Sequence, residues 1–273
     1  MLYNPYDKRD AFAPLAATSF STSSCHDDYR ARLGIMAREL ALRSPDILLL
    51  QDVFATADHR YNTAAYLARH LHMHASFHPA RPKTRHLDGR PIDSHCGLAV
   101  LSRHRIVASM KIDLPRDMRD GERIAQFVDL DVAGTRLLVV NVRVSHLAGA
   151  EALRRHQIER LADLLADASD YDHILVGGDF NTGPKDPALT PLRDLDGFSV
   201  SEAAPGRGVD RLFGLSRYGV MPMGLSNAQP ALERLDPATN LFPGARAALS
   251  ADLTLGQMYD HGQQSLALQT AAE

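Results

Sequence analysis

The order of hydrophobic and polar positions along this chain predicts helices and strands that alternate throughout. Apolar residues recur at helical spacing between residues 28 and 44, over 63–71 and from about 151 to 166. Continuous apolar runs at 47–50 and 174–177 are typical of strands buried on both faces. Further strands are predicted over 97–101, 127–132 and 137–142. This alternation favours a mixed α/β domain.

The segment 226–255 departs from this regular pattern. It contains Pro230, Pro237 and Pro243 and shows little periodicity, so we expect a long insertion with some helix, or a lid over a site. The chain has 273 residues, and neither an internal repeat nor a low-complexity linker divides it. We therefore expect one domain spanning residues 1–273.

Composition narrows the class of protein. Hydrophobic residues make up 45% of the chain and charged residues 23%, which is a globular composition. The net charge of -3 gives no global nucleic-acid footprint and argues mildly against tight nonspecific DNA binding. Two cysteines do not form a disulfide framework, and no run approaches the roughly 20 apolar residues of a membrane span. These features lead us to expect a cytoplasmic protein.

Polar side chains follow directly after the predicted strand 174–177. Asp179 and Asn181 stand two residues apart within the sequence Gly-Asp-Phe-Asn at 178–181. Side chains at strand ends in layered α/β folds are well placed for catalysis. Taken alone, a polar turn after a strand explains the same residues.

Five other segments, together with 178–181, resemble the motifs of one protein family. They are SPDILLLQDV at 44–53, GLAVLSR at 97–103, NVRV at 141–144 followed by RRHQ at 154–157, VDRLF at 209–213 and YDH at 259–261. In this order the six resemble the motifs pDIilLQEv, GlaiLSR, NTHL with RxxQ, GDFN, iDyif and SDH of the endonuclease/exonuclease/phosphatase superfamily.

The resemblance implies both a fold and an activity. The fold would be a four-layer αββα sandwich, in which helices flank two packed mixed β-sheets. The activity would be that of a divalent-metal-dependent phosphoesterase, in which Mg2+ or Mn2+ and a His/Asp-activated water hydrolyse a phosphodiester. The substrate class stays open between nucleic acid, phospholipid and a small phosphoester.

The same resemblance assigns roles residue by residue. The metal ligands would be Asp52, Asp260 and Ser21. The catalytic set would be His261, oriented by Asp210, together with Asp179 beside the nucleophilic water and Asn181, which would contact the phosphate or orient that water. The phosphate-binding residues would be Arg143, His146 and Asn141.

Three positions depart from the family's pattern. The run TSFS at 18–21 corresponds to the family's first strand, TfNi, so Ser21 stands for an asparagine. Asp52 stands for a glutamate, so its carboxylate is set back by one methylene. Arg143 falls where the second histidine belongs; an arginine binds phosphate bidentately but does not act as an acid at neutral pH. Alternatively, His146 is that histidine, displaced by three residues. These exchanges also motivate a second hypothesis, a degenerate member that binds a phosphate-bearing ligand or a protein without turnover.

Overall fold

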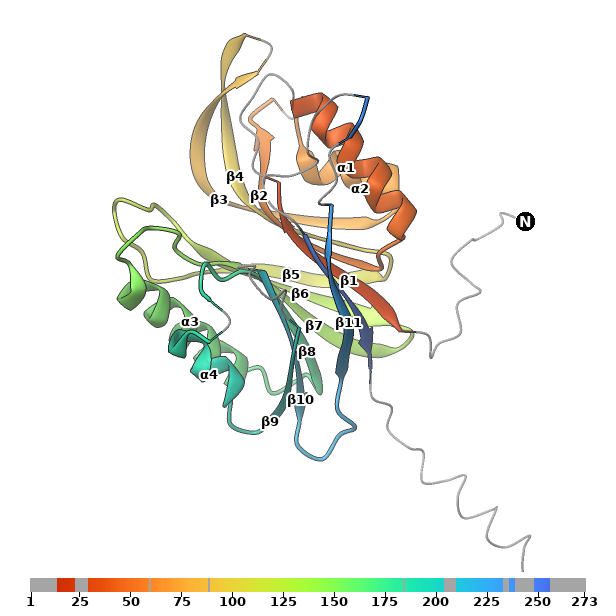
Figure 1. Ribbon diagram of the computed structural model, residues 1–273, viewed down its shortest axis with the longest axis vertical. Coiled ribbons are helices and arrows are strands. Elements are labelled where there is room, and N and C mark those ends of the chain that lie inside the picture. The colour runs from red at the N-terminus through yellow and green to blue at the C-terminus, as the bar shows by residue number, and fades with distance from the viewer. Residues whose placement is uncertain are drawn as a thin grey trace, which may run out of the picture.

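The protein is described by a computed structural model that covers residues 14–22, 29–58, 60–87, 89–183, 185–203, 210–232, 236–238 and 248–255. The side chains of Phe20 and Ser21 lie outside this description, as do Asp260 and His261. Two six-stranded β-sheets packed face to face dominate the described part (Figure 1). None of the described helices is both long and apolar enough to cross a lipid bilayer.

The first sheet combines both ends of the described chain with its N-terminal half. In spatial order its strands are β11 (Gly224–Ala231), β12 (Ala248–Thr254), β1 (Leu15–Ser21), β2 (Ile47–Thr56), β4 (Arg90–Ser102) and β3 (His74–Leu87). The pair β1 and β2 is parallel, and all other neighbours are antiparallel. The sheet is therefore mixed, as expected.

The second sheet comes from the middle of the chain. Its strands follow in the order β5 (Arg105–Asp113), β6 (Ile124–Val132), β7 (Thr135–Arg143), β8 (His173–Asp179), β10 (Asp210–Arg217) and β9 (Phe198–Ala203). Here the central pair β7 and β8 is parallel, and its carboxyl ends lie side by side. Those ends carry Arg143 and Asp179.

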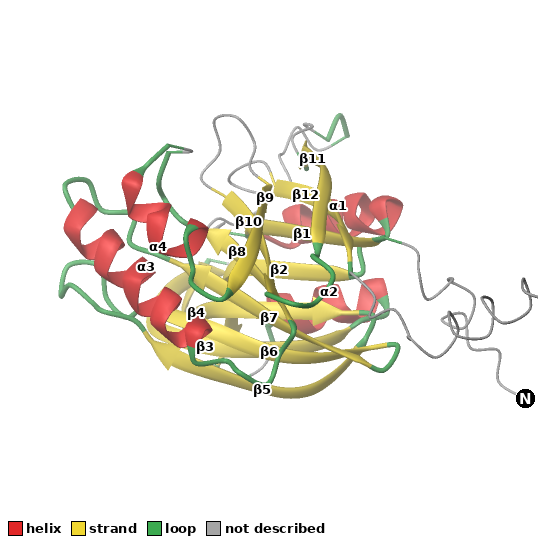
Figure 2. Cartoon of the chain, turned by 90° about the horizontal axis from the view of Figure 1, so that it is seen from below, coloured by secondary structure: helices red, strands yellow, loops and turns green. Residues whose placement is uncertain are grey.

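Helices cover the outer face of each sheet, which gives four layers (Figure 2). The helices are α1 (Tyr29–Arg43), α2 (Thr63–Leu71), α3 (Glu151–Ala166), α4 (Thr190–Arg193) and the 3-10 turn η1 (Pro187–Leu189). In β2, Leu48 and Leu50 pack against α1 and α2, whereas Ile47 and Leu49 face the second sheet. This alternation explains why the run 47–50 is apolar on both faces and confirms the αββα sandwich.

The segment 226–255 differs from its prediction. Residues 224–231 and 248–254 are strands, and β12 pairs with both β11 and β1. Their sequences escaped the strand pattern because β11 is largely exposed and carries Pro230, beside which the register of the strand pair is irregular. The strand residues of this segment therefore belong to the sandwich rather than to an insertion or lid.

Candidate active site

Asp52 occupies an irregularity in β2. Gln51 pairs with Leu98 of β4 and Val53 with Gly97, so Asp52 is the extra residue of a β-bulge. Its φ is 57°, a left-handed conformation that costs a residue with a side chain about 1–3 kcal/mol. Bulges re-aim side chains and are frequent beside active sites. The bulge gives Asp52 a position from which its carboxylate meets Arg143 of the second sheet.

Gly178 sets the spacing of β7 and β8. Its φ is 147°, and a Cβ atom there would lie 1.9 Å from the carbonyl oxygen of Val142. Only glycine tolerates this approach of the two strands. In the resulting register Arg143 lies beside Asp179, and Asp179 lies opposite Asp210 of β10. One arginine and two aspartates therefore stand in a row across three strand ends.

Arg143 links carboxylates from the two sheets. Its Nη1 donates to Asp52 Oδ1, and its Nε lies 3.5 Å from Asp179 Oδ2. The side chains of Arg143, Asp52 and Asp179 are only 13%, 7% and 1% exposed. Charges so poorly exposed are weakly screened and interact more strongly than surface pairs do. The Sγ of the free thiol Cys96 adds a weak contact to Asp52 Oδ1 at 3.6 Å.

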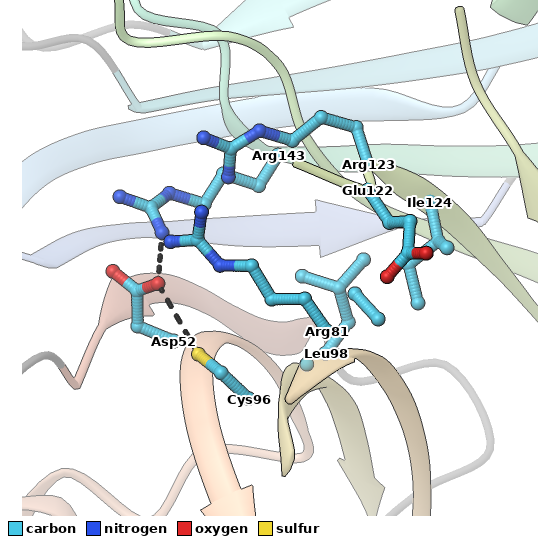
Figure 3. A pocket seen from close by; sticks show the side chains of 10 residues that line it. Asp52, Arg81, Cys96, Leu98, Glu122, Arg123, Ile124 and Arg143 are labelled. Atoms are coloured by element: carbon cyan, nitrogen blue, oxygen red, sulfur yellow. Dashed lines mark hydrogen bonds and ion pairs between the residues drawn. The ribbon is translucent and has the colours of Figure 1, made fainter. Parts of the chain in front are cut away.

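A pocket that is open to solvent lies beside this ion pair. Figure 3 shows the guanidinium groups of Arg81, Arg123 and Arg143 close together in it, with Asp52 and Cys96 at its edge. Arg123 donates from Nε to Asp120 Oδ2 at 2.9 Å, and Arg81 donates from Nη1 to the Asp120 carbonyl at 2.8 Å. Arg81 makes no ion pair with any described carboxylate. Several guanidinium groups facing one space are suited to binding an anion.

His146 lies next to this arginine cluster, in the loop after β7. Gln157 of α3 accepts from the Ser145 N–H at 2.8 Å through Oε1, and Arg154 donates to the Leu147 carbonyl at 2.9 Å. Arg154 and Gln157 therefore anchor the loop after β7 to α3. This shared role explains why the two residues recur at the RxxQ spacing.

The ring of His146 meets the Arg123–Asp120 pair. Its Nδ1 lies 2.9 Å from Arg123 Nη2 and 3.2 Å from Asp120 Oδ1. Burial and the positive charge of Arg123 lower the pKa of His146, so the neutral ring accepts the hydrogen bond from Arg123. The geometry therefore places Arg143, and not His146, between Asp52 and Asp179.

Asn141 lies in the core between the sheets. Its Nδ2 donates to the carbonyls of Leu50 at 3.0 Å and Ala99 at 2.9 Å, and its Oδ1 accepts from Gln51 Nε2 at 2.8 Å. Both amide donors are thus engaged with the first sheet. Asn141 fixes the packing of the two sheets, and this geometry leaves it no donor for the phosphate contact that was expected of it.

The remaining predicted residues surround the strand ends or lie beyond the described part. Asn181 adopts a φ of 47°, its N–H donates to Asp179 Oδ1 at 3.1 Å, and its Nδ2 donates to the Val144 carbonyl at 3.2 Å. Asp210 is 4% exposed. The backbone of Ser21 pairs with Gln51, whereas its side chain, Asp260 and His261 lie outside the described residues.

The donors in the described part do not fit a Mg2+ ion. Mg2+ requires about six oxygen ligands in near-octahedral geometry. Within the described ranges no group of three or more His, Cys, Asp or Glu side chains is arranged to hold a metal. The carboxylates of Asp52 and Asp179 instead face the guanidinium group of Arg143.

The sequence pattern did not single out Arg81, Arg123 or Asp120. The chain has 30 lysines and arginines, and nothing in their spacing distinguishes these two. Arg81 follows a second bulge, between Pro79 and Arg81 of β3, and Arg123 immediately precedes β6. Only the packing of the two sheets brings them together.

Comparisons with known proteins agree with the fold. The human nocturnin catalytic domain with a bound sulfate anion superimposes with a TM-score of 0.66 and 18% identity, over 89% of this chain and 95% of that one. D. rerio TDP2 complexed with a single-strand DNA product gives a TM-score of 0.67 and 14% identity, over 89% and 99%. An endonuclease/exonuclease/phosphatase from Beutenbergia cavernae gives a TM-score of 0.67 and 18% identity, over 89% and 72%. A search of curated proteins gives no match.

The family assignment follows from the sequence match over most of the chain. The model of the Endonuclease/Exonuclease/phosphatase family matches residues 25–244, which include both the Asp52 bulge and the strand ends that carry Arg143 and Asp179. The solved structures named above share the same two-sheet architecture. The chain therefore belongs to the endonuclease/exonuclease/phosphatase family.

Proposed function

We propose that the protein is a phosphoester hydrolase that holds the phosphate group of its substrate in the arginine-lined cavity. One observation carries the proposal. Three guanidinium groups line one pocket together with Asp52, and one of them, that of Arg143, also lies 3.5 Å from the buried carboxylate of Asp179 at the end of β8. Arginines neutralise phosphate oxygens, and a fixed carboxylate beside them orients a water molecule for attack on phosphorus.

Each residue of the described site would have a distinct role. Arg81, Arg123 and Arg143 would bind the non-bridging oxygens of the phosphate group. Asp179 would hold the attacking water, and Asn181 would keep Asp179 in place through its N–H. His261 and Asp210 would form the catalytic pair that the sequence suggests.

A divalent ion is not part of the proposed mechanism. The family includes metal-dependent phosphodiesterases, and the resemblance implies Mg2+ or Mn2+ at Asp52, Asp260 and Ser21. The described carboxylates do not fit such an ion, since both face Arg143. We therefore derive no catalytic step through a metal.

The comparisons support a phosphate-bearing substrate without selecting one. The nocturnin structure carries a sulfate anion, and the TDP2 structure carries a single-strand DNA product. Both ligands present tetrahedral oxyanions, which the arginine cavity suits chemically. A small phosphodiester and single-stranded DNA are therefore suitable first substrates for a test.

A second candidate is a phosphate-ligand-binding protein without turnover. The position of Arg143 favours it, because the guanidinium group holds both Asp52 and Asp179. A carboxylate held in this way is a poorer partner for water. Binding would then persist without hydrolysis.

Hydrolysis assays separate the two candidates. Bis(4-nitrophenyl) phosphate and a single-stranded oligonucleotide would be incubated with the protein in EDTA, in Mg2+ and in Mn2+. The hydrolase proposal predicts product formation that Asp179→Asn and His261→Ala abolish and that Arg155→Gln, on the exposed face of α3, leaves unchanged. Phosphate binding without product in any buffer would support the second candidate, and equal rates for all proteins would contradict the hydrolase.

A further inference from the structure

A guanidinium group stands where two carboxylates from different sheets converge. Asp52 reaches the site from the bulge of the first sheet, and Asp179 from the end of β8 in the second. Arg143 contacts both, through Nη1 and Nε respectively. Arg143 therefore brings a permanent positive charge to the point where the two carboxylates meet.

This charge disfavours a second cation at the same place. A divalent ion on Asp52 would have to displace its ion pair with Arg143 and would then lie beside the guanidinium group. Like charges at such separations repel strongly where exposure to water is low. The side chains of Asp52 and Arg143 are 7% and 13% exposed, so solvent screens this repulsion poorly.

The same arginine belongs to the anion-binding cavity. Arg123 already has Asp120 as its partner, whereas Arg81 lines the cavity and pairs with no carboxylate among the described residues. A phosphate group between them would give Arg81 an anionic partner and would meet Arg143 on its other side (Figure 3). Two or three arginines together supply the positive charge that a metal ion otherwise brings to a phosphate.

We propose that the guanidinium group of Arg143 takes the place of the divalent cation, so that the cavity binds a phosphate group with Arg81, Arg123 and Arg143 and without a metal ion. This inference rests on the proposed function in one respect, the binding of a phosphate group in this cavity. Beyond the proposed function, neither Mg2+ nor Mn2+ is needed for phosphate binding, and the charge of Arg143 alone excludes the divalent ion.

Calorimetry with inorganic phosphate tests the first part. Wild-type protein should bind phosphate equally well in EDTA and in Mn2+. Arg81→Gln should weaken binding about tenfold or more through loss of a charge-assisted contact. Arg155→Gln on the exposed face of α3 is the matched control and should bind as wild type does.

Electron paramagnetic resonance of Mn2+ tests the second part and does not depend on activity. Wild-type protein should leave Mn2+ in solution. Arg143→Gln, which removes the charge, should bind Mn2+ more than about tenfold more tightly, since a neighbouring like charge is gone. Arg143→Lys keeps the charge and should exclude Mn2+ like the wild type. Circular dichroism would check that each variant is folded. Asp52→Asn on the Arg143→Gln background should remove the new Mn2+ site.

The outcomes separate this inference from the proposed function. Phosphate binding that appears only with Mn2+, or wild-type protein that binds Mn2+ as tightly as Arg143→Gln, would overturn the inference and leave phosphoester hydrolysis intact. Failure of folded Arg143→Gln to bind Mn2+ would also count against it, because the charge would then not be what excludes the ion. Absence of phosphate binding in every buffer would instead refute the common premise.

Discussion

Gly178 offers the sharpest test of how the fold positions the site. In Gly178→Ala the new Cβ would lie 1.9 Å from the Val142 carbonyl oxygen, where atoms in proteins keep at least about 3 Å apart. The backbone φ of 147° is also one that an alanine adopts only under strain. Strands β7 and β8 must therefore separate beside Arg143 and Asp179, or Gly178 must change its backbone conformation.

The two penalties give the size of the effect. Overpacking in a well-packed region costs about 1–3 kcal/mol, and an unfavourable φ costs about 1–3 kcal/mol. We expect the free energy of unfolding to fall by about 2–6 kcal/mol, the sum of the two penalties and a large part of the roughly 5–15 kcal/mol typical of a folded domain. Denaturation in urea, followed by circular dichroism, measures this change.

A second glycine provides the control. Gly34 lies inside α1, and a Cβ there would meet nothing within 4 Å. Gly34→Ala should raise the free energy of unfolding by up to about 1 kcal/mol, because alanine favours helix. If Gly178→Ala cost less than about 1 kcal/mol, the close approach of β7 and β8 would not be what fixes the Arg143–Asp179 register.

Three further predictions concern the side chains of the site. Arg143→Met should destabilise the protein by about 3 kcal/mol, because two buried carboxylates lose their cation, and Asp52→Asn on that background should restore part of the loss in urea denaturation. If the double variant were less stable than Arg143→Met, the charge argument would fail. Gln157→Leu should cost about 1–3 kcal/mol and increase hydrogen exchange at the Ser145 N–H, which loses its acceptor; unchanged exchange there would contradict the role of α3. Because burial and Arg123 lower the pKa of His146, the unfolded ring takes up a proton at a higher pH than the folded one. The free energy of unfolding should then fall as the pH drops below about 6.5, and less so in His146→Ala; identical pH profiles of the two proteins would exclude His146 as the cause.

The sequence by itself determined the elements and the family. The helices at 63–71 and 151–166 agree with α2 and α3, because amphipathic spacing reflects one buried face and needs no knowledge of the partner. The run 47–50 is apolar at every position because helices cover one face and the second sheet covers the other. The order of the motifs pointed to the family that the match over residues 25–244 shows.

The tertiary structure decided which of the candidate residues meet. Asn141 belongs to a segment that resembles a family motif, yet its amide binds the first sheet, which only the stacking of β7 on β2 and β4 determines. Arg81 and Arg123 come from β3 and the turn before β6, and two bulges and the sheet packing bring them to Arg143. Spacing along a chain encodes which face of an element is buried. Contacts between elements depend on register and on bulges, and these follow from the energy of the whole packed core.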